Sequence, residues 1–334
     1  MTDSKTPASE VAALQPSPKG LGVLKAAFRE RRTLAMLLLG FSAGLPFAML
    51  FGTLNAWLSD AGVSVATIGV LSWVGLFGAF KFLWSPAVGL TPPVIGRMGR
   101  RRSWLILCQI VLAGALLGLH AFSKSRTTQL FGTIIARVET EKPVVALTFD
   151  DGPSARFTES VLATLRERGV KATFFLTGKE TEENLPQARM IVGAGHQLGN
   201  HSYAHSNMML MGPARIREEI ERTDVAIRAA GYGGEIMFRP PYGKKLLALP
   251  WYLSRHERKT IMWDVEPESF PDVAGDTAAF AKHVIEQTKN GSIIIMHVMY
   301  RSREISRQAL PLIIDGLRQR GFEFVTVSQL LDSR

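Results

Sequence analysis

An uncharged stretch of 21 residues, Leu34 to Leu54, limits most strongly what this chain of 334 residues can fold into. A helix rises ~1.5 Å per residue, so this stretch is long enough to cross a hydrocarbon layer of ~30 Å. Two further apolar windows follow at Ala66–Leu90, which is interrupted only by Lys81, and at Trp104–Phe122. The mean hydropathy of +0.11 agrees with a chain that lies partly in a membrane. We therefore expect an all-α membrane region of three transmembrane helices over residues 34–122.

Basic residues around these windows predict their orientation. Four Lys and Arg residues lie within the ten residues before the first window, and four Arg residues lie between the second and third windows, whereas the loop between the first and second carries only Asp60. Because Lys and Arg that flank membrane helices stay in the cytoplasm, residues 1–33 are expected there and everything after the third helix on the opposite side. These flanks account for most of the net charge of +10. We do not expect nucleic acid as a partner, because no nucleic-acid-binding pattern accompanies the charge.

The membrane region resembles the first three helices of AmpG-type muropeptide permeases of the major facilitator superfamily. The stretches that carry this resemblance are LLLGFSAGLPFAML, LSWVGLFGAFKFLWSPAVG and GRMGRRRSWLILCQ. A facilitator needs two six-helix halves, so three helices cannot complete a transport path. We expect these helices to serve as an anchor in the lipid bilayer, with Lys81 as an unpaired or snorkelling charge rather than a transport residue.

From Ser123 onward, short apolar runs alternate with amphipathic helical stretches. The strand candidates are 144–149, 172–177, 197–200, 235–239, 260–264, 292–297 and 322–326. Such alternation predicts an α/β barrel with a parallel sheet, in which chemistry gathers at the carboxyl ends of the strands. We expect a linker over 123–142 and a separate domain over 143–334.

Five short motifs lie, in chain order, at the ends of strand candidates. Asp150 and Asp151 emerge side by side, and His201 and His205 have a spacing that would place both imidazoles on one face of a helical turn. With a single cysteine, Cys108, only His, Asp and Glu side chains are available to hold a metal ion. The other three motifs are Arg239–Gly243, Trp263-Asp264 and Ile295–His297. Each motif alone could be structural, but together they supply what metal-assisted hydrolysis requires.

Residues 143–331 resemble the NodB-homology polysaccharide deacetylases, whose five ordered motifs correspond to TFDDGP, HSYAH, RPPYG, WD and IMH in this chain. The resemblance implies a distorted seven-stranded (β/α) barrel that hydrolyses the N-acetyl groups of a GlcNAc-type polysaccharide or oligosaccharide. It also implies one divalent metal ion, usually zinc, held by Asp151, His201 and His205.

The resemblance further implies a role for each remaining motif residue. These roles are general base for Asp150, orientation of that base for Arg239, an oxyanion contact from the backbone N–H of Tyr242, general acid for His297, and orientation of His297 for Asp264. The chain departs from many relatives at Glu268-Ser269, where an Asp-Trp pair is common, and at Val298. We expect these departures to affect the rim that binds substrate rather than the chemistry.

The predicted topology places the deacetylase domain outside the cytoplasmic membrane of a bacterium, on the periplasmic or extracellular side. The expected substrates are N-acetylated glycans found there, namely chitooligosaccharides, peptidoglycan strands or an exported exopolysaccharide. A second hypothesis is that the chain is a fragment or fusion of a muropeptide permease, in which the second domain only binds glycan. The presence of both Asp150 and His297 favours an enzyme over a pure binding domain.

Overall fold

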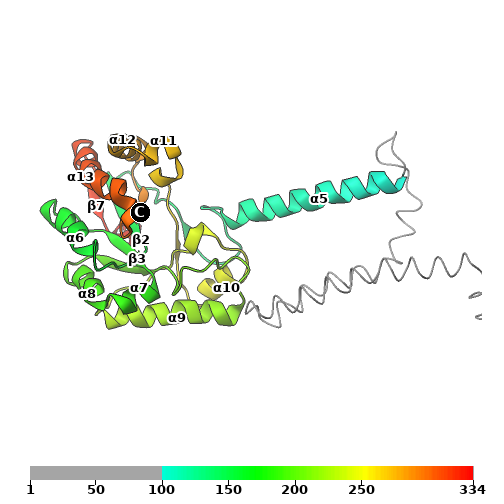
Figure 1. Ribbon diagram of the computed structural model, residues 1–334, viewed down its shortest axis with the longest axis horizontal. Coiled ribbons are helices and arrows are strands. Elements are labelled where there is room, and N and C mark those ends of the chain that lie inside the picture. The colour runs from blue at the N-terminus through cyan, green and yellow to red at the C-terminus, as the bar shows by residue number, and fades with distance from the viewer. Residues whose placement is uncertain (1–99, 334) are drawn as a thin grey trace, which may run out of the picture. The chain divides into compact units, whose positions relative to one another are not determined.

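The computed structural model describes residues 100–333 (Figure 1). The predicted helices at 34–54 and 66–90, with Lys81, lie outside the described residues, as does the segment 1–33. The third predicted helix corresponds to α5 (Arg100–Ser123). Within the described part of the chain, α5 is the one helix long and apolar enough to cross a membrane, through its window Ile106–Ser123. Only 6% of that window is buried, so its apolar side chains are available to lipid.

The domain that follows is built on a parallel sheet. Its strands are β2 (Val144–Asp150), β3 (Thr173–Leu176), β4 (Gln197–Asn200) and β6 (Ile293–His297), in the order β4-β3-β2-β6. All seven residues of β2 are buried, as expected for an apolar, β-branched run in the centre of a sheet that is covered on both faces. Pro143 precedes this strand, and the Gly152-Pro153 turn ends it just beyond the two aspartates.

Single-residue bridges close the sheet into a distorted barrel. Phe238 bridges Asn200 of β4 and Thr260 of β5 (Thr260–Ile261), and Val265 bridges Ile294 of β6. The expectation of a strand over 235–239 is therefore wrong. Within these five described residues, only Phe238 forms β-bridges. The two prolines that follow Arg239 have no backbone N–H to donate, so they stop a ladder from continuing.

The other two strands lie at the margins of the barrel. β7 (Glu323–Val325) pairs with the first three residues of β2, at the end remote from the aspartates. β1 (Ile134–Ile135) pairs with β5, and the backbone N–H of Val138 donates to the carbonyl oxygen of Gly291 at 2.9 Å. The stretch expected as a linker over 123–142 therefore supplies a strand and packs into the domain.

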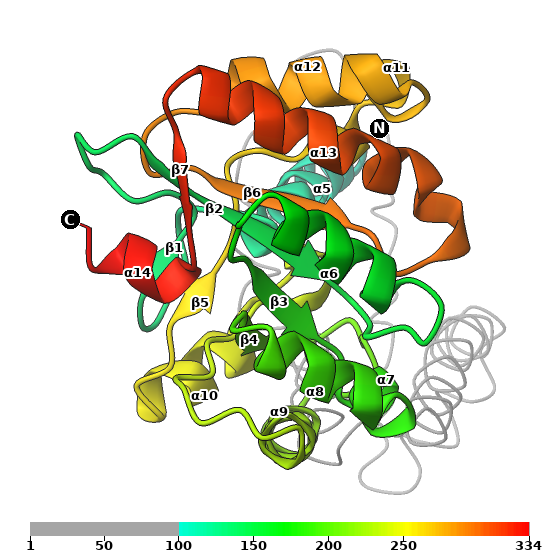
Figure 2. The same ribbon diagram turned by 90° about the vertical axis from the view of Figure 1, so that its left-hand side faces the viewer.

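Helices surround the strands (Figure 2). Their bounds are α6 (Thr158–Glu167), α7 (Gly178–Glu183), α8 (Leu185–Gly193), α9 (Pro213–Ala229), α10 (Ala248–Arg255), α11 (Pro271–Ala274), α12 (Thr277–Gln287), α13 (Glu304–Gln319) and α14 (Val327–Leu331). The helix α13 shows why they pack as they do, because it buries Leu310, Ile313, Ile314 and Leu317 on one face against the core. Burial of each such side chain contributes ~1.5–3 kcal/mol to folding.

Candidate active site

Asp150 ends β2 inside the barrel, where its side chain is 2% exposed. Its Oδ1 accepts a hydrogen bond from Nη1 of the fully buried Arg239 at 2.5 Å. Burial alone would raise the pKa of Asp150, but the positive charge and hydrogen bond of Arg239, with the charge of His297, outweigh burial and hold the pKa below the usual value. Asp150 is therefore ionised at neutral pH, as a general base must be.

Arg239 is held by several acceptors besides Asp150. Its Nη1 also donates to the hydroxyl of Thr148 at 2.8 Å, and its Nε and Nη2 donate to the carbonyl oxygens of Ile261 and Met262. Its guanidinium carbon lies 4.0 Å from the centre of the Phe175 ring. These contacts fix the guanidinium and, through it, the carboxylate of Asp150, so the structure is consistent with the orienting role expected for Arg239.

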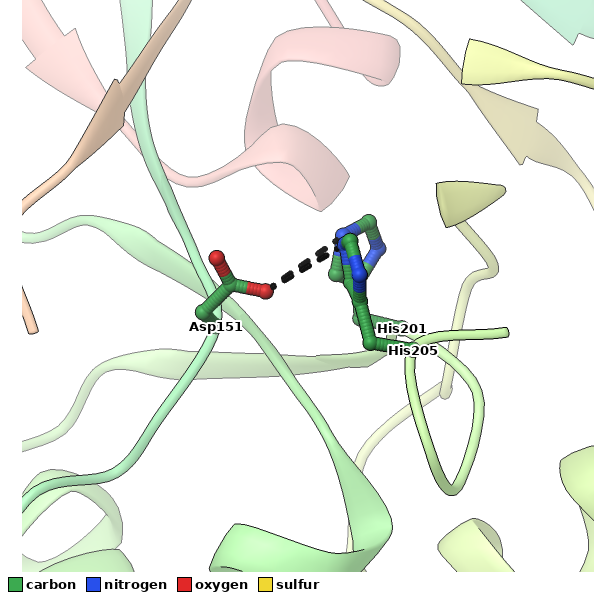
Figure 3. Close-up of side chains that lie close together, drawn as sticks. All are labelled: Asp151, His201 and His205. Atoms are coloured by element: carbon green, nitrogen blue, oxygen red, sulfur yellow. Dashed lines mark ion pairs between the residues drawn. The ribbon is translucent and has the colours of Figure 1, made fainter. Parts of the chain in front are cut away.

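Asp151, His201 and His205 converge on one another (Figure 3), and Nε2 of His201 lies 3.5 Å from Oδ2 of Asp150. One ligand atom from each lies within 4.8 Å of the others, and Nε2 of His201 and of His205 are 3.8 and 3.5 Å from Oδ1 of Asp151. This Oδ1 is buried and has no hydrogen-bond partner among the residues that the structure describes. Such an oxygen is costly unless a cation or donor meets it. Two imidazoles and one carboxylate are a donor set that fits zinc with a coordination position left open.

The protonation states of the two histidines also suit a metal site. Burial lowers the pKa of His201 to about 4 and lowers that of His205. Both rings are therefore neutral at pH 7, which is the form that binds metal ions. Nδ1 of His201 lies 2.8 Å from the carbonyl oxygen of Arg239, which can only accept, so Nδ1 carries the hydrogen and the lone pair of Nε2 faces Asp151.

The expected helical turn over His201–His205 is wrong. These residues form a loop, in which Ser202 and His205 have left-handed backbones with φ of 66° and 52°. Asp151 and Tyr242 are left-handed too, with φ of 71° and 58°. Left-handed conformations cost non-glycine residues ~1–2 kcal/mol each. Their concentration at this site indicates that the surrounding hydrogen bonds, such as that from Ser202 N to Asn200 Oδ1 at 2.8 Å, hold the ligands against local preference.

His297 ends β6 directly opposite Asp150 in the register of the sheet. The two motifs thus lie on neighbouring strands, because β6 pairs with β2 along its carboxyl-terminal residues, whereas β7 pairs only with the other end of β2. Nε2 of His297 lies 3.9 Å from Oδ2 of Asp151, so the ring faces the convergent ligands. The register itself therefore places a histidine beside the carboxylates.

Glu268 determines the charge of His297. Its Oε2 is hydrogen-bonded to Nδ1 of His297, and its Oε1 accepts the backbone N–H of His297 at 3.0 Å. Burial lowers the pKa of His297, but the hydrogen bond and negative charge of Glu268, with the charges of Asp150 and Asp151, outweigh burial and raise the pKa to about 9. His297 is consequently protonated at neutral pH, as a general acid must be.

The role expected for Asp264 is wrong. Its carboxylate accepts hydrogen bonds from the Ser292 hydroxyl and the Ile293 N–H, both at 2.8 Å, and so ties the chain after β5 to the start of β6. From there the chain runs beside β6, with Val265 opposite Ile294, until Glu268 reaches the carboxyl end of the strand. Asp264 therefore lies beside the first residues of β6, whereas His297 lies at the other end of that strand. The sequence did contain a signal for the true partner of His297, namely the acidic residue Glu268, which stands where this chain departs from many relatives.

Two further residues, Glu180 and Tyr300, border the site and were not predicted. Oε2 of Glu180 accepts the Gly152 N–H at 2.7 Å, and Oε1 accepts the hydroxyl of Tyr300 at 3.0 Å. Glu180 thereby joins the loops that follow β2 and β6. Tyr242, the residue expected to contribute an oxyanion contact, packs its ring edge-to-face with His205 at 4.6 Å between ring centres and is 59% exposed. No motif pattern marks Glu180 or Tyr300 in the sequence.

Two family models match the chain. A polysaccharide deacetylase model matches residues 137–260, and a model described as acetyl-coenzyme A transporter 1 matches residues 33–143. The first supports the deacetylase resemblance of the second domain. The second falls on the region with the permease resemblance and only weakly suggests a transporter-like origin for it.

Curated relatives agree with the first model. The chain is 34% identical over 194 residues to a peptidoglycan-N-acetylglucosamine deacetylase of Bacillus cereus, a match that covers 58% of this chain and 70% of that protein. It is 31% identical over 203 residues to the peptidoglycan-N-acetylglucosamine deacetylase PgdA of Listeria monocytogenes, covering 59% of this chain and 40% of PgdA. The chain thus spans less than half of the longer relative.

Solved structures show the same fold. A crystal structure of a peptidoglycan N-acetylglucosamine deacetylase superposes with a TM-score of 0.56 and 31% identity, covering 60% of this chain and 92% of that one. A CE4 family pseudoenzyme from Bacillus anthracis superposes with a TM-score of 0.53 and 30% identity, covering 60% and 69%. The chain belongs to the polysaccharide deacetylase family, with the barrel-like α/β fold of that family. It is a hydrolase of non-peptide carbon–nitrogen bonds.

Proposed function

We propose that this chain is a membrane-anchored, metal-dependent deacetylase that removes N-acetyl groups from a GlcNAc-type glycan, such as peptidoglycan, outside the cytoplasmic membrane. One observation carries the proposal: an ionised carboxylate, a three-residue ligand set and a protonated histidine meet at the carboxyl ends of β2, β4 and β6. Amide hydrolysis needs these three components together, because it requires a base, an electrophile and an acid.

The chain's own residues provide the proton transfers. Asp150 takes a proton from the water that attacks the acetamide carbonyl carbon, and Arg239 keeps Asp150 ionised until that step. His297 then gives its proton to the leaving nitrogen as the carbon–nitrogen bond breaks, so that acetate and a free amine are released. A divalent cation held by Asp151, His201 and His205, most often zinc, would make the water more acidic and polarise the carbonyl. The backbone N–H of Tyr242 is the proposed donor to the oxyanion.

The proposed anchor is the apolar region that includes α5. Large apolar side chains from Ile110 to Leu119 on this helix are exposed, which suits contact with lipid better than contact with water. With the two predicted helices before it, α5 would leave the deacetylase on the periplasmic or extracellular side of a bacterial inner membrane. N-acetylated cell-wall glycans are available there.

The metal site provides the direct test of this function. The purified full-length chain should release acetate from peptidoglycan strands or chitooligosaccharides, and a chelator should abolish the release until a divalent metal is restored. His201→Ala and His205→Ala should each lose most of the bound metal, because each removes one of three ligands. Metal content and acetate release are measured on the same preparations.

A matched control for these variants is His283→Ala. His283 lies on α12, where its ring packs against Phe270 at 4.7 Å between ring centres and not against the ligand set. This variant should keep its metal and its activity. Undiminished metal and normal acetate release in His201→Ala and His205→Ala would show that the ligand set has been assigned wrongly.

Topology can be tested with reporter fusions. Alkaline phosphatase folds into an active enzyme only after export, so a fusion placed after Ser123 should be active and one placed after Arg102 inactive. The reverse pattern would put the deacetylase in the cytoplasm and remove cell-wall polymers from the list of substrates.

A further inference from the structure

Residues Ser123–Arg126, which we call the tether segment, immediately follow the apolar helix α5 and contact two loops of the active site. One loop carries Tyr242 and continues through Lys245. The other follows Trp263 and carries Glu266 and Glu268. Both loops hold only a single 3₁₀ turn, at Pro241–Gly243 and at Pro267–Ser269, so little of their backbone bonding is internal. Loops of this kind depend on contacts from outside to keep one conformation.

Lys245 binds the tether segment to the first loop. Its backbone N–H donates to the carbonyl oxygen of Ser123 at 2.9 Å, and its ammonium group donates to the carbonyl oxygen of Ser125. The residue is only 2% exposed, and burial lowers its pKa to about 8. A buried ammonium group is costly unless its donors are used, so the bond to Ser125 ties the segment firmly to the loop that contains Tyr242.

Arg126 binds the tether segment to the second loop. Its guanidinium forms an ion pair with Glu266, two residues before Glu268, and lies 4.9 Å from the centre of the Trp263 ring. The same ring lies 5.5 Å from the guanidinium carbon of Arg239. Trp263 therefore lies close both to the side chain of the tether segment and to the arginine that holds Asp150.

Trp263 also touches the first loop. A Cβ placed on Gly243 would lie 3.1 Å from Cη2 of Trp263, closer than nine in ten real Cβ contacts, so the glycine next to Tyr242 lies directly against the indole. Gly243 has a φ of +65°, which further restricts the position to glycine. The tether segment, Trp263 and both loops thus form one packed unit behind the reacting groups.

We propose that the tether segment positions the catalytic loops, with Arg126 and Lys245 as positioning residues for Glu268 and for the backbone of Tyr242. This inference rests on the proposed function, because it assigns the two residues to the support of that same site. Arg126 acts on His297 only through the Glu266–Glu268 loop, and Lys245 acts only through the backbone that leads to Tyr242. The segment that connects the apolar helix to the enzyme is then part of the enzyme's own support.

The test uses the full-length chain with Arg126→Ala, the conservative Arg126→Lys and a matched control, Arg168→Ala. Arg168 also pairs with a carboxylate distant in sequence, with its Nε 3.1 Å from Oδ1 of Asp315, but it contacts neither loop through that pair. Amide hydrogen exchange is measured over residues 242–245 and 264–268, and kcat and KM for acetate release are measured beside it. Lys245→Met, which keeps the length and apolar character of the side chain, tests the second contact in the same way.

In Arg126→Ala we expect faster exchange in 264–268 and a kcat reduced at least about 10-fold, since displacements of ~1 Å near reacting groups are costly. KM and metal content should change little. Arg126→Lys should recover part of the loss, because a lysine keeps the ion pair and the charge over Trp263. Lys245→Met should accelerate exchange in 242–245.

Two results would overturn the inference. One is exchange in both loops that is the same in Arg126→Ala, Lys245→Met and the parent chain. The other is a loss in Arg168→Ala as large as that in Arg126→Ala, which would indicate a general effect on stability. Failure of the parent chain to release acetate would count against the proposed function, whereas the exchange data decide the positioning role by themselves.

Discussion

His297→Ala and Asp150→Asn should each reduce kcat by at least about 100-fold, because each removes one of the two proton transfers that amide hydrolysis requires. The two side chains occupy paired positions on β2 and β6, and neither is needed to complete the ligand set of Asp151, His201 and His205. Both variants should therefore keep their metal. The measurements are kcat for acetate release and metal content on purified protein.

The parent chain should show a rate that is bell-shaped in pH, with limbs that belong to the coupled site rather than to single residues. His297→Ala keeps the buried pair of Asp150 and Arg239 intact, so it separates chemistry from folding better than the aspartate variant does. If His297→Ala bound metal and kept a kcat near that of the parent chain, the general acid would have to be another group at this end of the barrel.

Glu268→Gln should shift the alkaline limb of the pH–rate profile toward lower pH. The hydrogen bond and negative charge of Glu268, followed by the charges of Asp150 and Asp151, raise the pKa of His297 to about 9. Glutamine removes the Glu268 charge while it keeps a side chain of similar size. Only the protonated form of His297 can act as the acid. If the pKa of His297 is lowered, His297 loses its proton, and the enzyme its activity, at a lower pH. We expect kcat at pH 8 to fall at least about 10-fold, which is measured with the full pH profile.

Asp264→Asn is the matched control, since it alters an acidic residue on the same loop that is bonded to Ser292 and Ile293 instead. It should leave the alkaline limb where it is. The raised pKa of His297 also means that its pair with Glu268 stabilises the folded state. This contribution is complete at pH values below the unfolded histidine pKa of ~6.5, and it is lost as the pH rises through about 9, where folded His297 loses its proton. An alkaline limb that moved equally in both variants would contradict a specific role for Glu268.

The sequence predicts those parts of the site that a strand presents directly. Val144–Phe149 and Ile293–Met296 are short apolar runs that predict buried strands. The positions of Asp150 and His297 at strand ends therefore follow from the sequence pattern alone. The ordered motifs likewise bring Asp151, His201 and His205 into one cluster, and the structure places them together. In these cases local pattern and tertiary structure agree.

Other features depend on contacts that no local pattern contains. The approach of His205 requires a left-handed backbone that only the packed loop enforces, and Glu268 reaches His297 because the chain follows β6 for four residues beyond Asp264. The short strand β1 exists because β5 offers it an unpaired edge. A two-residue strand has too little pattern of its own to be recognised, which is why residues 123–142 read as a linker.

The register of β2 against β6 has a consequence for how this enzyme can change. Neighbouring strands lie ~4.8 Å apart because backbone hydrogen bonds fix that spacing, so the separation of Asp150 and His297 is inherited from the ladder and not from the shape of any loop. Loops around the opening can then be lengthened, shortened or exchanged while the proton donor and acceptor keep their distance. Exchange of these loops can therefore alter which glycan is bound. A shift of the β2–β6 register by one residue, in contrast, would separate Asp150 from His297 and abolish turnover.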